Sequence, residues 1–473
     1  MIQTQTYPGI ALPAPRSSSH NLGIVLAVGL SISISAALWF GNKPQLLRVA
    51  IPALAAFVGI LLYTTRPIAY VSYSLWVWFL APFVRRVVDW HFGFFEPNFV
   101  LLAPLLVSGI SVLTFFPSNR VAGTRVPKAF ILCGLAILYG FSVAVLRHAS
   151  EEAVFSLVNW LSPMLFGLHL YLNWPYYEQY RTAITRTFVL ALLILGLYGI
   201  YQFFLPPSWD ITWLDNVKAG SFGLPEPMQI RVWSTMNSPG PFANAMMAGL
   251  LMLLVVRIRL KLPAAIAGYL ALLLSVVRTA WLSWAVGLLW ILKSAKPRLM
   301  VRLVLFAALL VICIVPLASD PRISNVVGDR FRSFTDLGHD ASFGDRSDMY
   351  KILLAEAADN PFGYGLRNLE NFHGIAIDSG ILILIFSLGW FGSALFLTGL
   401  GALFLSRGRP KDHTDEFSQA SKAIAVAVLA QLIAGDVFAN VTGAIFWIFA
   451  AMYLAGNRYH EDQSTIGSNL GHA

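Results

Sequence analysis

Residues 379–406 read SGILILIFSLGWFGSALFLTGLGALFLS and contain no aspartate, glutamate, lysine or arginine. A transmembrane helix needs about 20 mostly apolar residues, and this uncharged run is longer than an ordinary core helix. Two further stretches, 98–118 and 187–206, also lack acidic and basic residues. Of the 473 residues, 57% are hydrophobic and 12% are charged, whereas about a quarter are charged in a soluble domain. The sequence therefore predicts a polytopic integral membrane protein.

The hydropathy pattern predicts an all-α fold with about 14 transmembrane helices, or 12 to 14 when the ends are uncertain. The predicted spans are 22–40, 47–63, 67–84, 98–116, 128–146, 155–172, 187–205, 241–256, 263–277, 279–292, 301–317, 379–405, 420–435 and 440–455. The spans 263–277 and 279–292 are each short, but the loops before the first and after the second are both rich in lysine and arginine. Basic loops stay on the cytoplasmic side, so two spans fit these loops better than one long helix.

The same charge bias predicts that both termini are cytoplasmic, with a tail at 1–21, a transmembrane domain at 22–457 and a second tail at 458–473. Within the transmembrane domain this topology predicts two outer loops, a medium one at 206–240 and a long one at 318–378. The long loop contains many charged residues and a helical pattern that begins near Ser347 and stops at Asn360-Pro361. Long loops in compact proteins are commonly functional, so we expect this one to cap an active site.

Several classes of protein do not fit the sequence. Cys133 and Cys313 lie inside predicted spans, which excludes a disulfide framework or a cysteine metal site. The net charge of +9 comes from short basic loops between helices, as membrane topology requires, so we expect no nucleic acid partner. No glycine-rich nucleotide loop, metal-ligand spacing or nucleophile elbow occurs in the sequence, and we expect no cofactor.

Arg278 separates two apolar helices at the predicted outer boundary of the membrane. A cation at this depth needs an anionic partner or a water-filled cavity, and arginine binds phosphate oxygens through paired hydrogen bonds. One interpretation is therefore an anionic ligand. The other is a topological anchor whose head group reaches the lipid phosphates, and position alone favours neither.

Two more arginines lie near predicted outer boundaries. Arg231 precedes the small-residue turn Ser234-Thr235-Met236-Asn237-Ser238, which opens a span whose amides could receive an anion. Serine and asparagine before a helix are also ordinary caps. Arg346 lies between two aspartates at the start of the helical pattern in the long loop, where pairing with a neighbouring carboxylate is the simpler interpretation.

Asp378 is the ionisable group that opens the uncharged run at Ser379. Its carboxylate is a candidate general base because burial would raise the pKa from about 3.9 toward the range useful for proton transfer. Aspartate is equally a good helix cap, and both roles can coexist. His373, in the same loop, is the other nearby candidate for proton transfer.

Aromatic residues gather in the outer loops. They are Trp209, Trp213 and Trp233 in the medium loop, and Trp90, Phe92, Phe94 and Phe95 in an earlier one. Such residues could stack on sugar rings, but they are more often part of the aromatic belts at membrane interfaces.

Four segments together resemble the O-antigen polymerase and ligase superfamily of bacterial membrane glycosyltransferases. They are STMNSPGPFANAMMAG at 234–249, SVVRTAWL at 275–282, GDRSDMYKILLAEAADNPFGYG at 344–365 and DSGILILIFSLGWFG at 378–392. Each motif is degenerate, and their order around one large outer loop carries the resemblance. Ligases of this superfamily place His-Asn where Asp378 and Ser379 stand here, which favours a polysaccharide polymerase over a ligase.

The resemblance implies a helical glycosyltransferase of GT-C type in the bacterial inner membrane. Its substrates would be a polyprenyl-pyrophosphate-linked oligosaccharide and an acceptor glycan. Arg278, Arg231 and Arg346 are expected to face the pyrophosphate or glycan charges, and Asp378 the acceptor hydroxyl.

We further expect Asn237, Arg367 and His373 to contact the substrate, with no metal or other cofactor. The partners would be the lipid bilayer and, in the same pathway, a flippase and a chain-length regulator. An O-antigen ligase or protein O-oligosaccharyltransferase is the alternative within the family. A membrane transporter is the alternative of another class, although no internal repeat of broken helices supports it.

Overall fold

The computed structural model describes residues 18–116, 126–218, 220–293, 341–367, 377, 379–405 and 415–470. Within these ranges the chain is helical apart from turns and one isolated β-bridge between Gly223 and Ile230, which confirms the predicted all-α class. Seven helices in the described part are long and apolar enough to cross a membrane. The predicted number of 14 spans is not confirmed, and the span predicted at 301–317 lies outside the described residues.

The helices follow the predicted spans closely in most places. The first half of the chain contains α1 (Ser18–Phe40), α2 (Pro44–Thr65), α3 (Pro67–Phe92), α4 (Leu102–Gly109), α5 (Lys128–Leu146), α6 (Ser150–Leu172), α7 (Tyr177–Phe204) and α8 (Ser208–Val217). The second half contains α9 (Pro239–Val255), α10 (Lys261–Leu274), α11 (Arg278–Lys293), α14 (Ala341–Asp359), α15 (Gly380–Leu405), α16 (Glu416–Leu429) and α17 (Asn440–Leu470). Short 3-10 turns, η1 (Phe99–Leu101) and η2 (Ile110–Phe115), flank α4 and break the span predicted at 98–116 into three pieces.

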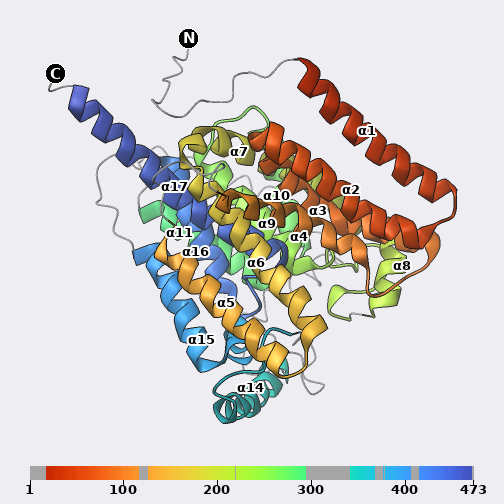
Figure 1. Ribbon diagram of the computed structural model, residues 1–473. Helices are drawn as coiled ribbons and strands as arrows, with labels where there is room; N and C mark the ends of the chain where they lie inside the picture. The colour runs from red at the N-terminus through yellow and green to blue at the C-terminus, as the bar shows by residue number, and fades with distance from the viewer. Residues whose placement is uncertain are drawn as a thin grey trace.

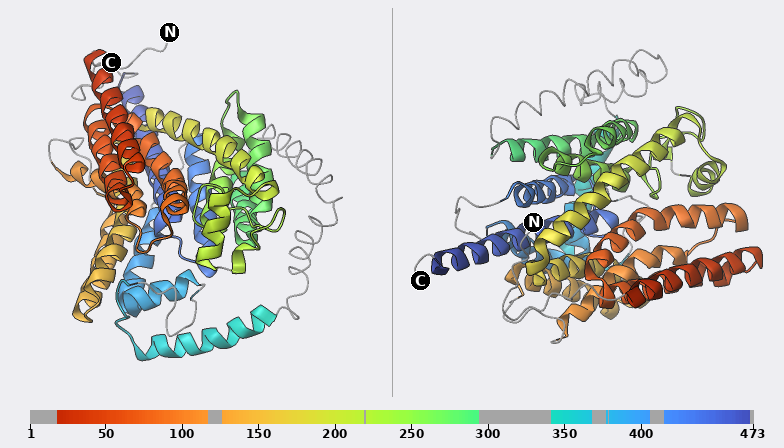
Figure 2. Two further views of the ribbon diagram at one scale, coloured as in Figure 1. Left: turned by 90° about the vertical axis from the view of Figure 1, so that its right-hand side faces the viewer. Right: turned by 90° about the horizontal axis from the view of Figure 1, so that it is seen from above.

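The helices form one bundle with α9 at its centre. Every residue of α9 from Phe242 to Leu254 is buried, and α7, α10, α11, α16 and α17 pack around it. Figures 1 and 2 show α1 at the edge of the bundle, where it packs against α2. The helix α14 lies across one end (Figure 2, left). We call this the loop end, where α3, α7 and α10 finish and α9 and α11 begin, and the opposite end the tail end.

The helix α3 extends two turns beyond the span predicted at 67–84 and ends at Phe92, before Gly93 with φ +93°. Trp90 and Phe92, predicted in a loop, are therefore in this helix. The extension is stable because its charged residues have partners: Asp89 lies 3.1 Å from Arg48 and 3.2 Å from Arg85. Charged residues can thus be buried at the end of an apolar helix without ending it.

Near the loop end, α15 is interrupted at Gly389, whose φ of 64° and ψ of −179° are not helical. The neighbouring segment 361–364 supplies the missing hydrogen bonds. The Tyr364 amide donates to the Phe386 carbonyl at 2.6 Å, and the Trp390 amide donates to the Pro361 carbonyl at 2.9 Å. Gly363 allows this close approach, since a Cβ there would lie 2.4 Å from the Gly389 nitrogen. The segment is therefore built into the wall of the bundle.

The structure corrects one predicted boundary and adds helices to two predicted segments. The helix of the long loop, α14, begins at Ala341 rather than near Ser347, and it ends at Asp359, before Asn360-Pro361 as expected. The medium loop contains the helix α8. The segment predicted as a C-terminal tail continues α17 as far as Leu470, because no proline or glycine pair stops the helix after the apolar part ends.

Candidate functional site

The turn at Ser234-Thr235-Met236-Asn237-Ser238 is fixed at the loop end by buried polar side chains. Arg86 of α3 donates to the carbonyls of Ser234 and Met236. The Thr235 hydroxyl donates to the Phe79 carbonyl at 2.7 Å. The Gln202 side-chain oxygen accepts from the amide of Ser234 at 2.9 Å. The turn that opens α9 is therefore rigidly placed before any ligand arrives.

An ion pair with no solvent exposure supports this turn. The Nε of Arg86 lies 2.8 Å from Asp210 of α8, and both side chains are 0% exposed. The same carboxylate accepts from Gln202 at 2.7 Å and from the Tyr198 hydroxyl at 2.8 Å, and Trp209 donates to Tyr198 at 2.8 Å. A buried charge is tolerated only when it is paired and hydrogen-bonded, and this pair meets both conditions. The network couples α3, α7 and α8 to the turn.

The turn between α10 and α11 lies directly against the residues before the first turn. The Val232 amide donates to the Leu274 carbonyl at 3.1 Å. The Arg231 guanidinium donates to Ser275 O at 3.3 Å and to Val276 O at 3.1 Å. Val276 has a φ of 53°, a conformation that is rare for a β-branched residue and that persists only where the surroundings impose it. The hydrogen bonds from Arg231 are part of that support.

The structure thus brings the residues just before one predicted motif, 234–249, against the start of another, 275–282. Arg231 also donates to Ser221 O at 2.7 Å, so much of its donor capacity is directed at backbone carbonyls. Arg278 is the first residue of α11, two residues after Val276, and is partly buried. The buried Oδ1 of Asn237 has no hydrogen-bond partner among the described residues. The Asn237 side chain, the Arg231 guanidinium and the first residue of α11 therefore belong to the same part of the loop end.

The other predicted site residues are less well placed. Arg367 follows the segment at 361–366 and lies 3.7 Å from Glu152, both partly exposed. Arg346 belongs to the backbone of α14, but its side chain lies outside the described atoms. His373 and Asp378 lie outside the described residues. Their predicted roles remain predictions.

Asp436 is a candidate that sequence reasoning missed. The carbonyl of Gly435 lies against Gly380, the first residue of α15, where a Cβ would be 2.1 Å away. Asp436 accepts from the Phe438 amide at 2.8 Å, and burial raises the pKa of its carboxyl to about 6. The signal in the sequence was a single carboxylate between the apolar stretches 420–435 and 440–455. Such a group near a membrane boundary is a functional candidate by default.

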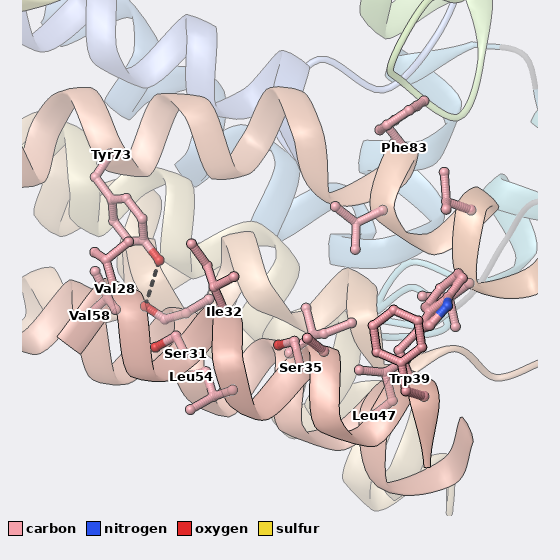
Figure 3. A pocket seen from close by; sticks show the side chains of 17 residues that line it. Val28, Ser31, Ile32, Ser35, Trp39, Leu47, Leu54, Val58, Tyr73 and Phe83 are labelled. Carbon is pink, nitrogen blue, oxygen red and sulfur yellow. Dashed lines mark hydrogen bonds between the residues drawn. The ribbon is translucent and has the colours of Figure 1, made fainter. Parts of the chain in front are cut away.

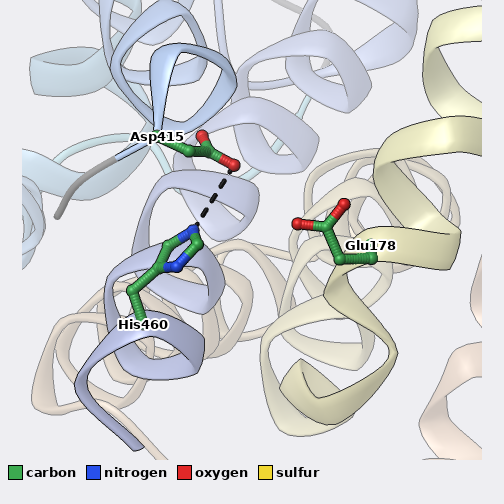
Figure 4. Close-up of side chains that lie close together, drawn as sticks. All are labelled: Glu178, Asp415 and His460. Atoms are coloured by element: carbon green, nitrogen blue, oxygen red, sulfur yellow. Dashed lines mark ion pairs between the residues drawn. The ribbon is translucent and has the colours of Figure 1, made fainter. Parts of the chain in front are cut away.

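A second cluster of titratable residues lies at the tail end (Figure 4). Glu178, Asp415 and His460 have ligand atoms within 4.8 Å of one another, a spacing that a metal ion could use. Arg181, however, lies 3.2 Å from Asp415 and 3.4 Å from Glu178. Its guanidinium therefore pairs with both carboxylates, and Nε2 of His460 lies 3.4 Å from Asp415. The cluster joins α7, α16 and α17, and we assign it a structural role.

Two of the seven aromatic residues predicted in the outer loops are buried and cannot be sugar platforms. Trp213 and Trp233 are 5% and 0% exposed, and Trp213 lies under the Arg85 guanidinium at 4.7 Å. Trp90 is 43% exposed and contacts Trp209 edge to face at 5.8 Å. Phe92, Phe94, Phe95 and Trp209 are partly buried, so Trp90 is the most accessible of these seven aromatic residues.

One comparison with known proteins found a match. Residues 263–397 match a family model described as O-Antigen ligase. The matched range includes α10, α11, α14 and the first part of α15, and therefore Arg278, Arg346 and Arg367. No curated protein and no solved structure matched the chain. The family match confirms the resemblance predicted from the sequence.

Proposed function

We propose that this chain, which belongs to the O-antigen polymerase and ligase superfamily, is the polymerase that joins lipid-linked repeat units of a bacterial exopolysaccharide or O-antigen. The observation that carries the proposal is the fixed meeting of the 231–238 and 274–278 segments at the loop end. The contacts of Arg231 with Ser275 and Val276, close to Arg278 in the chain, support a role for these two arginines in binding a membrane-anchored anion.

The proposed reaction is a glycosyl transfer from a polyprenyl pyrophosphate. The acceptor hydroxyl oxygen forms a bond to the anomeric carbon of the donor, the bond from that carbon to the pyrophosphate oxygen breaks, and the hydroxyl proton passes to a carboxylate. Pyrophosphate is already a good leaving group, so the protein must orient the hydroxyl, stabilise the phosphate charge and accept a proton. Arg278 supplies the positive charge.

Two carboxylates are candidates for accepting the proton. Asp378 is the residue predicted from the sequence. Asp436 lies beside the first turn of α15, and its pKa of about 6 suits a base at neutral pH. Asp378 precedes Gly380 by two residues in the sequence, and its own position lies outside the described residues.

A polymerase fits better than a ligase because the ligase dipeptide His-Asn is replaced by Asp378-Ser379. The enzyme would act at the outer face of the inner membrane, with both termini cytoplasmic. A flippase would deliver its lipid-linked donor, and a chain-length regulator would act on its product. Transfer of finished chains to lipid A core or to a protein is the competing function within the superfamily.

The test is the length of surface glycan in deletion cells complemented with wild type, Arg278→Ala or Asp378→Asn. Arg186→Ala and Asp215→Asn are matched controls, because both wild-type residues are exposed and neither belongs to the polar network at the loop end. We expect the two site variants to reach the membrane at normal levels yet to produce single repeats only.

Three results would count against the proposal. Full restoration of long polymer by both site variants would make Arg278 and Asp378 structural residues. Accumulation of full-length chains on the lipid carrier in deletion cells would identify a ligase instead. Solute uptake or lipid flipping by reconstituted protein, unaffected by Asp378→Asn and without glycoside formation, would indicate a transporter.

A further inference from the structure

An apolar groove lies between α1, α2 and α3 (Figure 3). Its volume of about 570 Å³ is within the range of small-molecule sites, about 300–1,000 Å³. One face of α1 forms a wall, with Val28, Ile32, Ser35 and Trp39 at helical spacing. From α3 the opposite wall includes Phe83.

The groove is open along its length because α1 is loosely held. In the apolar part of α1 only 6% of the residues are buried, and the helix packs mainly on α2. Toward the loop end the lining residue Trp39 stacks on His91, with ring centroids 4.4 Å apart, and meets the edge of Phe92 at 5.1 Å. A lipid would therefore enter the groove sideways from the bilayer, with its head group toward the loop end.

The polar atoms in the walls are mostly engaged within the protein. The Ser31 hydroxyl donates to the Ala27 carbonyl at 2.8 Å, and the Tyr73 hydroxyl donates to the Ala55 carbonyl at 3.1 Å. These groups offer little to a polar ligand. The groove is therefore suited to a flexible hydrocarbon chain, whose burial needs no hydrogen bonds.

The groove is also continuous with the candidate site. The ring of Phe83 contacts Tyr198 at 5.5 Å and Trp209 at 6.3 Å between centroids. It also lies under the Arg86 guanidinium at 5.8 Å. Arg86 holds the 234–236 turn directly. One side of this ring thus faces an apolar groove and the other faces the polar network of the site.

We propose that the groove between α1 and α3 binds the isoprenoid chain of the lipid-linked donor, with the pyrophosphate directed toward the loop end. This inference rests on the proposed function for the identity of the lipid. A bulk phospholipid shares the apolar chain and a phosphate, so the two occupants are separated by measuring binding in phospholipid nanodiscs, where bulk lipid is in excess.

The experiment measures equilibrium binding of a radiolabelled long-chain polyprenyl pyrophosphate, without sugar, to the full chain in phospholipid nanodiscs. The blocking variant is Ser35→Trp, which fills the groove. Ser33→Trp is the matched control, because Ser33 is an exposed serine of the same helix on the opposite face and does not line the groove. A second blocking variant from the other wall, Val87→Phe, covers the case in which Ser35→Trp fails to fold.

We expect wild type and Ser33→Trp to bind equally, and the folded blocking variants to bind at least about tenfold more weakly. Geranyl pyrophosphate and inorganic pyrophosphate should compete poorly, because they lack the long chain. Equal binding by all folded variants, or equal competition by inorganic pyrophosphate, overturns the groove as the chain site. If wild type does not bind the polyprenyl pyrophosphate, the proposal is also overturned, and bulk lipid is the occupant of the groove. Because the assay forms no polymer, its outcome is separate from that of the glycan-length test.

Discussion

The buried ion pair between Arg86 and Asp210 offers a sharp test of how the loop end is held. In Asp210→Asn the carboxylate is replaced by a neutral amide, while its size is kept. Both side chains are 0% exposed and their charged atoms are 2.8 Å apart. Removing one partner from such a pair leaves a buried, uncompensated charge and typically costs about 3–5 kcal/mol. We therefore expect the free energy of unfolding to fall by about that amount.

The assay is denaturant-induced unfolding in one detergent, with Asp215→Asn as the control. Asp215 is an exposed aspartate of the same helix, α8, so this variant makes the same chemical change without removing a buried charge. If the two variants unfold at the same denaturant concentration, the ion pair is not desolvated and the reasoning is wrong.

A double variant, Arg86→Met with Asp210→Leu, separates the charge from the hydrogen bonds. An apolar pair of similar size commonly recovers the cost of a broken ion pair. Here recovery should be incomplete, by about 1–3 kcal/mol, because the carbonyls of Ser234 and Met236 lose their donor. Complete recovery would show that these two bonds contribute nothing.

Three further variants test other parts of the structure. Gly363→Ala should reduce polymer length, because its Cβ would lie 2.4 Å from the Gly389 nitrogen, whereas Gly240→Ala, with nothing within 4 Å, should not; equal glycan profiles would contradict this. Arg231→Lys should lower the free energy of unfolding by about 1–2 kcal/mol, since one ammonium cannot reach the three carbonyls that the guanidinium contacts, and unchanged hydrogen exchange at 274–278 would argue against it. The pKa of Asp436 is raised from 3.8 to about 6, so its protonated carboxyl stabilises the fold below pH 3.8. As the pH rises through 6, the free energy of unfolding should therefore fall by about 3 kcal/mol. Asp436→Asn should not show this fall.

Much of the helical framework was predictable because the apolar runs are long and their ends are marked. The span predicted at 128–146 matches α5 to the residue, since a proline and basic residues precede it and Arg147 follows. The end of α14 was predictable from Asn360-Pro361, because the residue before a proline disfavours the helical conformation.

The features that sequence reasoning missed depend on partners distant in the chain. Arg86 and Asp210 are 124 positions apart by number (210 − 86), and nothing in the local pattern indicates that they neutralise each other. The interruption of α15 at Gly389 was equally hidden, because a glycine in an uncharged run looks like a small packing residue. Only the close approach of Gly363 explains it.

The interruption of α15 has a consequence for chimeric proteins. The Phe386 carbonyl and the Trp390 amide form hydrogen bonds with residues 361–364 instead of with each other. Transplanting a foreign outer loop without this short segment would leave both groups unpaired in an apolar wall, at a cost of several kcal/mol for each in lipid. A chimera should therefore keep the segment 361–366 together with α5 and α15. The exchange point for a foreign loop should lie before Asn360.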